Sequence, residues 1–311
     1  MFHERKNSDV LLNNVKSIDR HLIPNAVFIK VNANISALYK GSVRNLADLK
    51  KLSMPKCGIK IVLPQAFQNL PKLKIVHLQD NKIEIIQNGV FNYLPIVELY
   101  LQRNQIRIIQ PEAFDNMPNL FKIHMNNNQL QQWDNNWFKN TPKLTLIYFR
   151  RNQIQTIPLK AFANIKTSHG NNGNEMVDMK IYLSRNNISS IHLQAFQGID
   201  ALNELWLDRN YIEKIDVNTF SHIKELDKLF LQRNYISDVD KHAFRNFEVM
   251  SLLNLSNNEL TCLPYEVISK ARVINITKSN IYCDCLLYLS EKLEEDELPN
   301  EILHDSECLL D

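Results

Sequence analysis

The sequence predicts an α/β solenoid in which each repeat adds one short strand to a parallel β-sheet. Three observations lead to this prediction. Asparagine recurs at a nearly constant step, an alternating apolar segment stands before each of these asparagines, and a phenylalanine follows all but the last of them ten residues later. A constant step of this length indicates a repeat architecture, in which each unit buries its apolar side against the next.

Each repeat is centred on one asparagine. The steps between successive copies are 23, 24, 24, 34, 24, 24 and 24 residues, for Asn81, Asn104, Asn128, Asn152, Asn186, Asn210, Asn234 and Asn258. The frame before them is L-x-x-L-x-L-x-x-N-x-I, as in "LKIVHLQDNKI" from Leu73 and "LNELWLDRNYI" from Leu202. The phenylalanines are Phe91, Phe114, Phe138, Phe162, Phe196, Phe220 and Phe244.

This frame accounts for the strand, the turn and the need for stacking. In L-x-L the leucines point to one face and the variable residue to the other, which is the period of a strand. One repeat would bury about seven apolar side chains at roughly 2 kcal/mol each, against about 1.5 kcal/mol for ordering each residue, so only a stack is stable. The asparagine amide satisfies backbone groups where the chain leaves the strand, so that Asn rather than Gly makes the turns.

The pattern resembles the leucine-rich repeat of the typical class, about 24 residues long, found in extracellular animal proteins such as Toll-like receptor ectodomains, Slit and insect leucine-rich immune proteins. The resemblance implies a curved horseshoe of about ten repeats, with the parallel sheet on its concave face and a mostly irregular or short-helical convex side. Cys57 stands at the asparagine position of one repeat and Ser279 at that of the last. We expect Cys57 to be a buried structural thiol.

The chain is expected to have three parts. Residues 1–24 form an N-terminal cap or irregular segment, where Leu11, Val15, Ile18 and Leu22 give weak support for a short helix. Residues 25–282 form the solenoid, beginning with a degenerate strand in "AVFIKVNANISAL", and residues 283–311 form a partial cysteine-rich cap. The longer 34-residue step places a polar loop at 166–177, which is either a partner-contacting protrusion or a tolerated insertion.

The C-terminal "NIYCDCLLYLSEKL" resembles the cysteine-rich cap of extracellular leucine-rich solenoids. The resemblance implies a Cys283–Cys308 disulfide and a short helix near residues 286–293. It also implies a fourth cysteine as the partner of Cys285, so that either the chain is truncated or Cys285 is free or intermolecular; Cys262 is the less favoured partner. A metal site is a rival interpretation, which lacks a second cysteine pair and a suitably spaced His. A disulfide-bonded cap favours an oxidising compartment.

The variable positions of the strands are expected to line the concave face. Seven consecutive mid-strand positions carry a ring, at His77, Tyr100, His124, Tyr148, Tyr182, Trp206 and Phe230. Five arginines stand directly before the repeated asparagines, at Arg103, Arg151, Arg185, Arg209 and Arg233. Over ten repeats these variable positions hold 15 Lys or Arg and 5 Asp or Glu, leaving 21 basic and 29 acidic residues elsewhere, so a formal net charge of +2 conceals a basic inner face.

Two interpretations of the rings and arginines remain open. Cross-strand rings, with Arg stacked on them as a cation–π pair, could stabilise the sheet without any ligand. Alternatively, exposed Tyr, Trp and Arg are the residue types that dominate binding hot spots, and they would then recognise an acidic protein or an anionic glycan.

Four glycosylation sequons occur, at Asn34, Asn187, Asn254 and Asn275. Their number is about that expected by chance, but Asn254 and Asn275 occupy the mid-strand position where the rings stop. Glycans at these two positions would confine a partner to the ring-bearing strands.

No catalytic constellation, phosphate-binding loop or cofactor motif is recognisable, so an enzyme is not expected, nor is a bound metal or nucleic acid. No apolar run approaches the roughly 20 residues of a membrane span, and no signal peptide is visible. We expect a secreted or cell-surface-derived, receptor-like recognition module, with an immune or developmental role implied by the resemblance alone. The alternatives are an adhesive matrix protein that self-associates, as a homodimer or as a covalent dimer through an unpaired cysteine, and a cytoplasmic scaffold with reduced cysteines.

Overall fold

The computed structural model describes residues 17–21, 23, 25–165, 178–305 and 307–309. Contacts between residues group the chain into two compact units, Met1–Asn152 and Gln153–Asp311. The insertion at 166–177 and most of the expected N-terminal segment lie outside the described residues.

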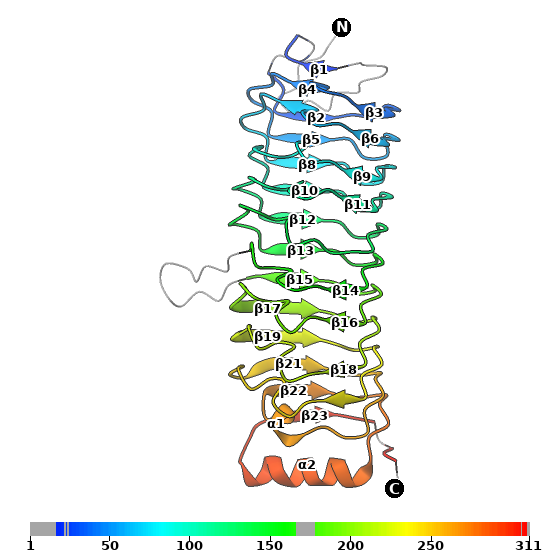
Figure 1. The fold of residues 1–311 in the computed structure, drawn as a ribbon, viewed down its shortest axis with the longest axis vertical. Coiled ribbons are helices and arrows are strands. Elements are labelled where there is room, and N and C mark those ends of the chain that lie inside the picture. The colour runs from blue at the N-terminus through cyan, green and yellow to red at the C-terminus, as the bar shows by residue number, and fades with distance from the viewer. Residues whose placement is uncertain (1–16, 22, 24, 166–177, 306, 310–311) are drawn as a thin grey trace. The chain divides into compact units, whose positions relative to one another are not determined.

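Each unit is built on a parallel sheet to which every repeat contributes one strand (Figure 1). In the first unit the strands follow one another as β2 (Phe28–Lys30), β5 (Lys51–Ser53), β8 (Ile75–His77), β10 (Glu98–Tyr100), β12 (Lys122–His124) and β13 (Leu146–Tyr148). In the second they follow as β15 (Lys180–Tyr182), β17 (Ala201–Trp206), β19 (Glu225–Phe230), β21 (Met250–Asn254), β22 (Ala271–Asn275) and β23 (Glu301–Leu303). Strands that pair are consecutive repeats, so the predicted parallel β-solenoid is confirmed.

Short two-residue strands pair on other sides of the repeats. In the first unit these are β1 (Ile18–Asp19), β4 (Val43–Arg44) and β7 (Phe67–Gln68), then β3 (Ala37–Leu38) with β6 (Ile61–Val62) and β9 (Ile85–Ile86) with β11 (Ile108–Ile109). In the second they are β14 (Thr156–Ile157) with β16 (Ser190–Ile191) and β18 (Lys214–Ile215) with β20 (Asp238–Val239). Ile18, grouped by spacing with a possible helix, instead pairs in β1 with Val43.

The core of each repeat is the one that the apolar spacing predicts. The central residues of the strands are fully buried, as Leu99 and Ile123 illustrate. The phenylalanines form a second ladder, with ring centroids 6.2 Å apart for Phe91 and Phe114 in the first unit and 5.4 Å apart for Phe162 and Phe196 in the second. The layers therefore stack on both apolar rows of the repeat, as a solenoid requires.

The repeated asparagine holds each turn to the repeat before it. The Nδ2 atom of Asn104 donates to the carbonyl oxygens of Leu101 and, one repeat earlier, Leu78, both at 2.9 Å. Its Oδ1 atom accepts from the backbone N–H of Ile83 at 3.1 Å. The residue before it, Arg103, has φ of 55°, a left-handed conformation that usually favours glycine. The amide thus pairs the backbone groups that this turn would otherwise bury unpaired.

Two repeats depart from this rule. Cys57 takes the asparagine position and is only 1 % exposed, as expected, with its Sγ atom 3.5 Å from the Val31 carbonyl oxygen. Burial raises the pKa of the Cys57 thiol. Ser279 takes the position in the last repeat, and its buried Oγ atom has no hydrogen-bond partner among the described residues. A serine is too short to replace the asparagine amide, which fits its place at the end of the stack.

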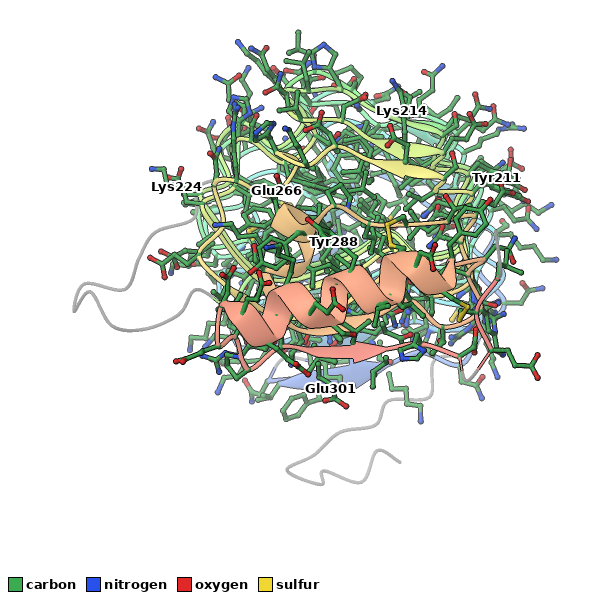
Figure 2. The ribbon with its side chains drawn as sticks, turned by 90° about the horizontal axis from the view of Figure 1, so that it is seen from below. Tyr211, Lys214, Lys224, Glu266, Tyr288 and Glu301 are labelled. Atoms are coloured by element: carbon green, nitrogen blue, oxygen red, sulfur yellow. A yellow bond between two sulfur atoms is a disulfide. The ribbon has the colours of Figure 1, made fainter. Side chains whose placement is uncertain are left out.

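The C-terminal helix α2 (Cys283–Glu295) closes the second unit (Figure 2) and buries Cys285, Leu289 and Leu293. A shorter helix, α1 (Tyr265–Ile268), precedes it, and the Tyr265 hydroxyl donates to the carboxylate of Asp296, the residue that follows α2. The expected cap helix near 286–293 is therefore present and extends by about one turn at its start.

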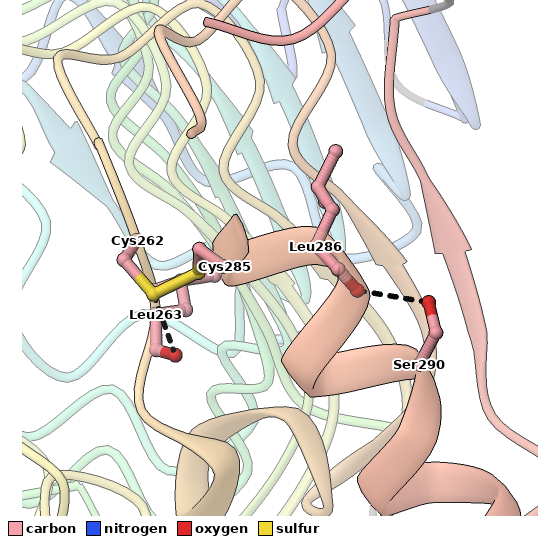
Figure 3. The surroundings of a disulfide bond; sticks show 5 residues. All are labelled: Cys262, Leu263, Cys285, Leu286 and Ser290. Carbon is pink, nitrogen blue, oxygen red and sulfur yellow. Dashed lines mark hydrogen bonds between the residues drawn. A yellow bond between two sulfur atoms is a disulfide. The ribbon is translucent and has the colours of Figure 1, made fainter. Parts of the chain in front are cut away.

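The structure contains the Cys283–Cys308 bridge, and it pairs Cys285 with Cys262 (Figure 3). The expectation that Cys285 lacks a partner within the chain is wrong. Cys262 lies four residues after Asn258 and Cys285 six residues after Ser279, so they stand on adjacent repeats, and stacking brings the two Cα atoms to 5.7 Å. Cys57 is then the single unpaired cysteine, and its burial removes the basis for a disulfide-linked dimer.

We expect Asn128→Ala to lower the free energy of unfolding by about 3 kcal/mol or more, because three buried backbone groups lose their partner. These are the carbonyl oxygens of Leu101 and Met125 and the N–H of Ile106. Urea denaturation of the full chain measures the change. Gln129→Ala is the matched control, since the Gln129 side chain is exposed, and an equal loss in both variants would contradict this role of the amide.

Peptide mapping without reduction should find Cys262 linked to Cys285 and Cys283 linked to Cys308. Cleavage before Asp284 is needed, because it separates the two cap cysteines, Cys283 and Cys285. Cys57 should react with an alkylating reagent only after unfolding. A Cys285 thiol that is free in the folded, oxidised protein would refute the assigned pairing.

Candidate functional site

In each strand the residues directly before and after the central core residue, such as Leu99 in β10 and Leu205 in β17, lie on the side away from the core, and we call this surface the strand face of each unit. In β10, for example, Glu98 and Tyr100 are half-buried and flank the fully buried Leu99. The strand face of the first unit carries the predicted rings His77, Tyr100, His124 and Tyr148. That of the second carries Tyr182, Trp206 and Phe230, of which Phe230 is buried, with 9 % of the residue exposed.

The four rings of the first unit form one stack. Ring centroids are 4.4 Å apart for His77 and Tyr100, 6.0 Å for Tyr100 and His124, and 5.0 Å for His124 and Tyr148. Interplanar angles of 9°, 27° and 12° show that the rings lie face to face. Each ring is half-buried because its neighbours cover its faces, which leaves the outer edges accessible.

Two charged residues that the mid-strand pattern did not select hold Tyr100. Its hydroxyl donates to the Glu98 carboxylate and accepts from Lys122 Nζ at 3.2 Å. The same Nζ atom lies 4.9 Å from the Tyr100 ring centroid and 5.5 Å from that of Tyr148. Desolvation, together with Glu98, raises the pKa of Tyr100, so this hydroxyl stays neutral. The cation over these rings is Lys122 rather than Arg103, which pairs with Asp80.

Both histidines of the stack are held neutral. Desolvation, with help from Lys122 and Arg103, lowers the pKa of His124 from its usual 6.5 to about 4. Desolvation and then Lys51 lower the pKa of His77. The Nδ1 atoms of both rings are buried and have no hydrogen-bond partner among the described residues. At neutral pH these rings therefore behave as aromatic surface and add no positive charge.

The rings of the second unit are organised around Glu204. Centroids are 5.8 Å apart for Tyr182 and Trp206 and 3.7 Å for Trp206 and Phe230. The Glu204 carboxylate accepts from Trp206 Nε1 at 2.7 Å and from the Tyr182 hydroxyl at 3.1 Å, and Lys180 Nζ lies 3.4 Å away. Burial pushes the pKa of Glu204 up, but these partners outweigh it and hold the pKa below its usual value. The carboxylate thus fixes both ring orientations.

Comparison with known proteins agrees with this architecture. A BspA type leucine-rich repeat region, in 6 copies, matches residues 36–169, and a leucine-rich repeat model matches residues 179–236 and 224–275. The chain is a leucine-rich repeat protein. No curated protein sequence matches it significantly.

Two solved structures contain chains of similar fold. One belongs to the Toll–Spatzle complex, described as a hub in Drosophila development and innate immunity, with 16% identity and a TM-score of 0.61 over 86% of this chain and 47% of that chain. The other belongs to an octameric complex of latrophilin 3, Unc5D and the leucine-rich repeats of FLRT2, with 18% identity and a TM-score of 0.59 over 83% of each chain. This protein thus spans about half the length of the first matched chain.

The arginines of the leucine-rich repeats lie at the turns that end the strands. Arg103, Arg151, Arg185 and Arg233 are exposed, and Arg209 is half-buried with its Nε atom 3.9 Å from an Asp208 carboxylate oxygen. All five have φ between 55° and 59°. The five arginines therefore share one turn position of the repeat. In the first unit the cation that lies over the rings is Lys122 and not an arginine.

The ring search also missed Tyr211 and Tyr235, which directly follow repeated asparagines. Their rings stack 5.8 Å apart, and the residues are 49 % and 47 % exposed. Figure 2 shows Tyr211 on a different side of the second unit from Glu301 of β23, so this pair lies off the strand face. The signal was present in the sequence, since "RNYI" occurs in two successive repeats.

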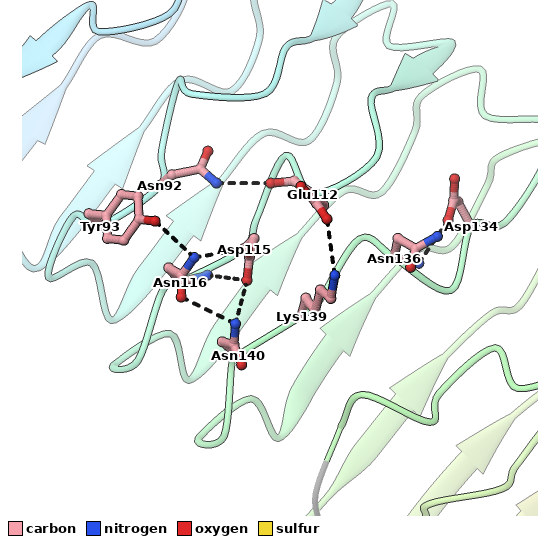
Figure 4. Close-up of polar contacts among 9 residues, drawn as sticks. All are labelled: Asn92, Tyr93, Glu112, Asp115, Asn116, Asp134, Asn136, Lys139 and Asn140. Carbon is pink, nitrogen blue, oxygen red and sulfur yellow. Dashed lines mark hydrogen bonds and ion pairs between the residues drawn. The ribbon is translucent and has the colours of Figure 1, made fainter.

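A polar ladder joins successive repeats along another edge of the first unit (Figure 4). Asn140 donates to Asp115 at 3.0 Å and to Asn116 at 3.2 Å, and Asn116 donates to the Tyr93 hydroxyl at 3.2 Å. These contacts link side chains of three successive repeats. This edge is structural in character.

Within the described residues no helix is long and apolar enough to cross a bilayer.

Acid should destabilise the first unit partly through His124. Its pKa is about 4 in the folded protein, against a usual 6.5 for the unfolded chain, so the unfolded state binds more protons between these values and stability falls as pH falls through this range. The urea midpoint of unfolding should therefore fall less between pH 7 and pH 4.5 in His124→Gln than in the wild type. His242→Gln, at an exposed site, is the control; an unchanged pH dependence in His124→Gln would contradict the prediction.

Proposed function

We propose that this leucine-rich repeat protein is a non-enzymatic recognition module whose strand face binds an acidic protein partner. The observation that carries the proposal is the ring stack with basic residues around it. Half-exposed Tyr and Trp edges flanked by Arg and Lys provide the side chains that contribute most to protein interfaces. Glu204, an acidic residue of this face, bonds to Trp206 and Lys180. Among the arginines, Arg103 pairs with Asp80 and Arg209 lies near Asp208, whereas Arg151, Arg185 and Arg233 are exposed at the surface.

The similar solved structures support a protein as the partner. Toll is complexed with Spatzle, and FLRT2 with latrophilin 3 and Unc5D, so both related folds are found in protein assemblies. We extend protein binding, and an immune or developmental setting, to this chain as part of the proposal. An anionic glycan is the second candidate, and the basic strand face favours it equally on charge alone.

We further propose that the protein is extracellular or displayed at the cell surface. Two disulfides close its C-terminal cap, and such bridges persist in oxidising compartments. A cytoplasmic scaffold would have these cysteines reduced. An adhesive matrix protein remains the alternative to a receptor-like module, but self-association would then have to be non-covalent, since Cys57 is buried.

The proposal is tested by screening the folded protein against an array of individual secreted and cell-surface ectodomains. Trp206→Ala and Tyr148→Ala, one in each unit, should each make the binding free energy of an identified partner less favourable by about 2 kcal/mol or more. Neither substitution should unfold the chain. Leu205→Ala, at a core position beside Trp206, should lower the free energy of unfolding by about 2–5 kcal/mol.

Two outcomes would redirect the assignment. A partner whose Kd is unchanged by Trp206→Ala, Tyr148→Ala and Arg233→Ala, yet weakened by Tyr211→Ala, would exclude the strand face. Binding to heparin that survives Trp206→Ala but is removed by salt would favour the anionic glycan, because such binding depends on charge. If Trp206→Ala destabilises the protein as much as Leu205→Ala, the rings are structural.

A further inference from the structure

In the second unit the ring stack ends at a pair of asparagines. The strand register aligns Phe230 with Asn254 on the next strand, and Asn254 with Asn275 on the one after. Both asparagines are half-buried on the strand face and begin the sequons Asn254-Leu-Ser256 and Asn275-Ile-Thr277. Parallel strands lie about 4.8 Å apart, so these two acceptor side chains are immediate neighbours.

The two side chains have the same hydrogen-bond arrangement. Asn254 Oδ1 accepts from the Ser256 backbone N–H at 3.1 Å and from its Oγ at 2.8 Å. Asn275 Oδ1 accepts from the Thr277 backbone N–H at 3.1 Å and from its Oγ1 at 2.8 Å. In both, the sequon itself holds the amide oxygen toward the strand. Neither Nδ2 atom donates a hydrogen bond to the described residues.

We propose that Asn254 and Asn275 carry N-linked glycans that form one boundary of the strand face. In this step Nδ2 bonds to C1 of the reducing-end sugar of a lipid-linked oligosaccharide, the lipid pyrophosphate leaves, and the amide proton passes to the transferase. The inference rests on the proposed extracellular location. It goes further, because it assigns a modification to this surface and limits a partner in the second unit to β15, β17 and β19.

The neighbouring residues favour a covered surface here. On the same face, Leu252 and Val273 precede the two asparagines in their strands and are half-buried apolar residues in adjacent register. A glycan on either asparagine would lie over this apolar pair and shield it. The asparagines do not form a side-chain ladder with each other, since both amide oxygens bond within their own sequons. The remaining sequons, at Asn34 and Asn187, lie outside the ring-bearing strands and serve as internal comparisons.

The test expresses the full chain with a supplied secretion signal and maps peptides after enzymatic deglycosylation in heavy-oxygen water, which labels every formerly glycosylated asparagine. We expect label on Asn254 and Asn275. Ser256→Ala should remove only the first and Thr277→Ala only the second, while Ser256→Thr should keep the label and controls for folding.

The outcomes separate this inference from the proposed function. Secreted, disulfide-bonded protein with unlabelled Asn254 and Asn275 overturns the glycan boundary and leaves the recognition proposal standing. Labelled asparagines, together with a partner whose Kd is unchanged by Trp206→Ala, Tyr148→Ala and Arg233→Ala but weakened by Tyr211→Ala, overturn the recognition proposal alone. Retention of the protein inside the cell with all cysteines reduced overturns both.

Tryptophan fluorescence can test whether the glycans limit access to the rings. Trp133 and Trp137 are buried, so Trp206 is the half-exposed tryptophan. Quenching of its fluorescence by a bulky solute should increase in an Asn254→Gln, Asn275→Gln double variant relative to the glycosylated protein. Equal quenching in the two proteins would show that the glycans do not limit access to the rings.

Discussion

The hydrogen bonds of the repeated asparagine are the constraint on which the other features of each unit depend. A strand that ends after three residues must turn sharply, and here the turn passes through a left-handed residue at every repeat. Such a turn leaves carbonyl and N–H groups pointing into the core. Because one amide provides both donor and acceptor, it pairs these groups within its own repeat and with the repeat before it, as Asn104 does. Folding of one layer therefore requires its neighbour.

This arrangement leaves the outward residues of the strands free to vary. The apolar and asparagine rows determine stability, so the strand face can carry rings, carboxylates and cations without disturbing the core. The register is fixed, so the side chain at one position of a repeat lies beside the side chain at the same position of the next repeat. Tyr182, Trp206 and Phe230 are stacked for this reason, and Glu204 can reach rings on two strands.

Features that recur with the repeat could be predicted from the sequence, and features that depend on pairs of non-equivalent positions could not. The Asn and Phe ladders and the ring row follow from spacing alone. The Cys262–Cys285 bridge joins different positions of adjacent repeats, four residues after Asn258 and six residues after Ser279, and it was missed for that reason. Lys122 and Glu204 were missed because a search along one row cannot detect a contact between two rows.

The arginine row places a measurable demand on the backbone. An L-residue in the left-handed conformation is less stable than glycine there by roughly 1–2 kcal/mol, yet Arg185, Arg209 and Arg233 occupy this position in three consecutive repeats. Asparagine, which tolerates the conformation better, holds the same position at Asn127, within the ring stack, and at Asn257, beyond it. Mutual repulsion between successive guanidinium groups adds to the cost. Neither the turn nor the sheet needs a positive charge at this position, and this is one reason for proposing an acidic partner.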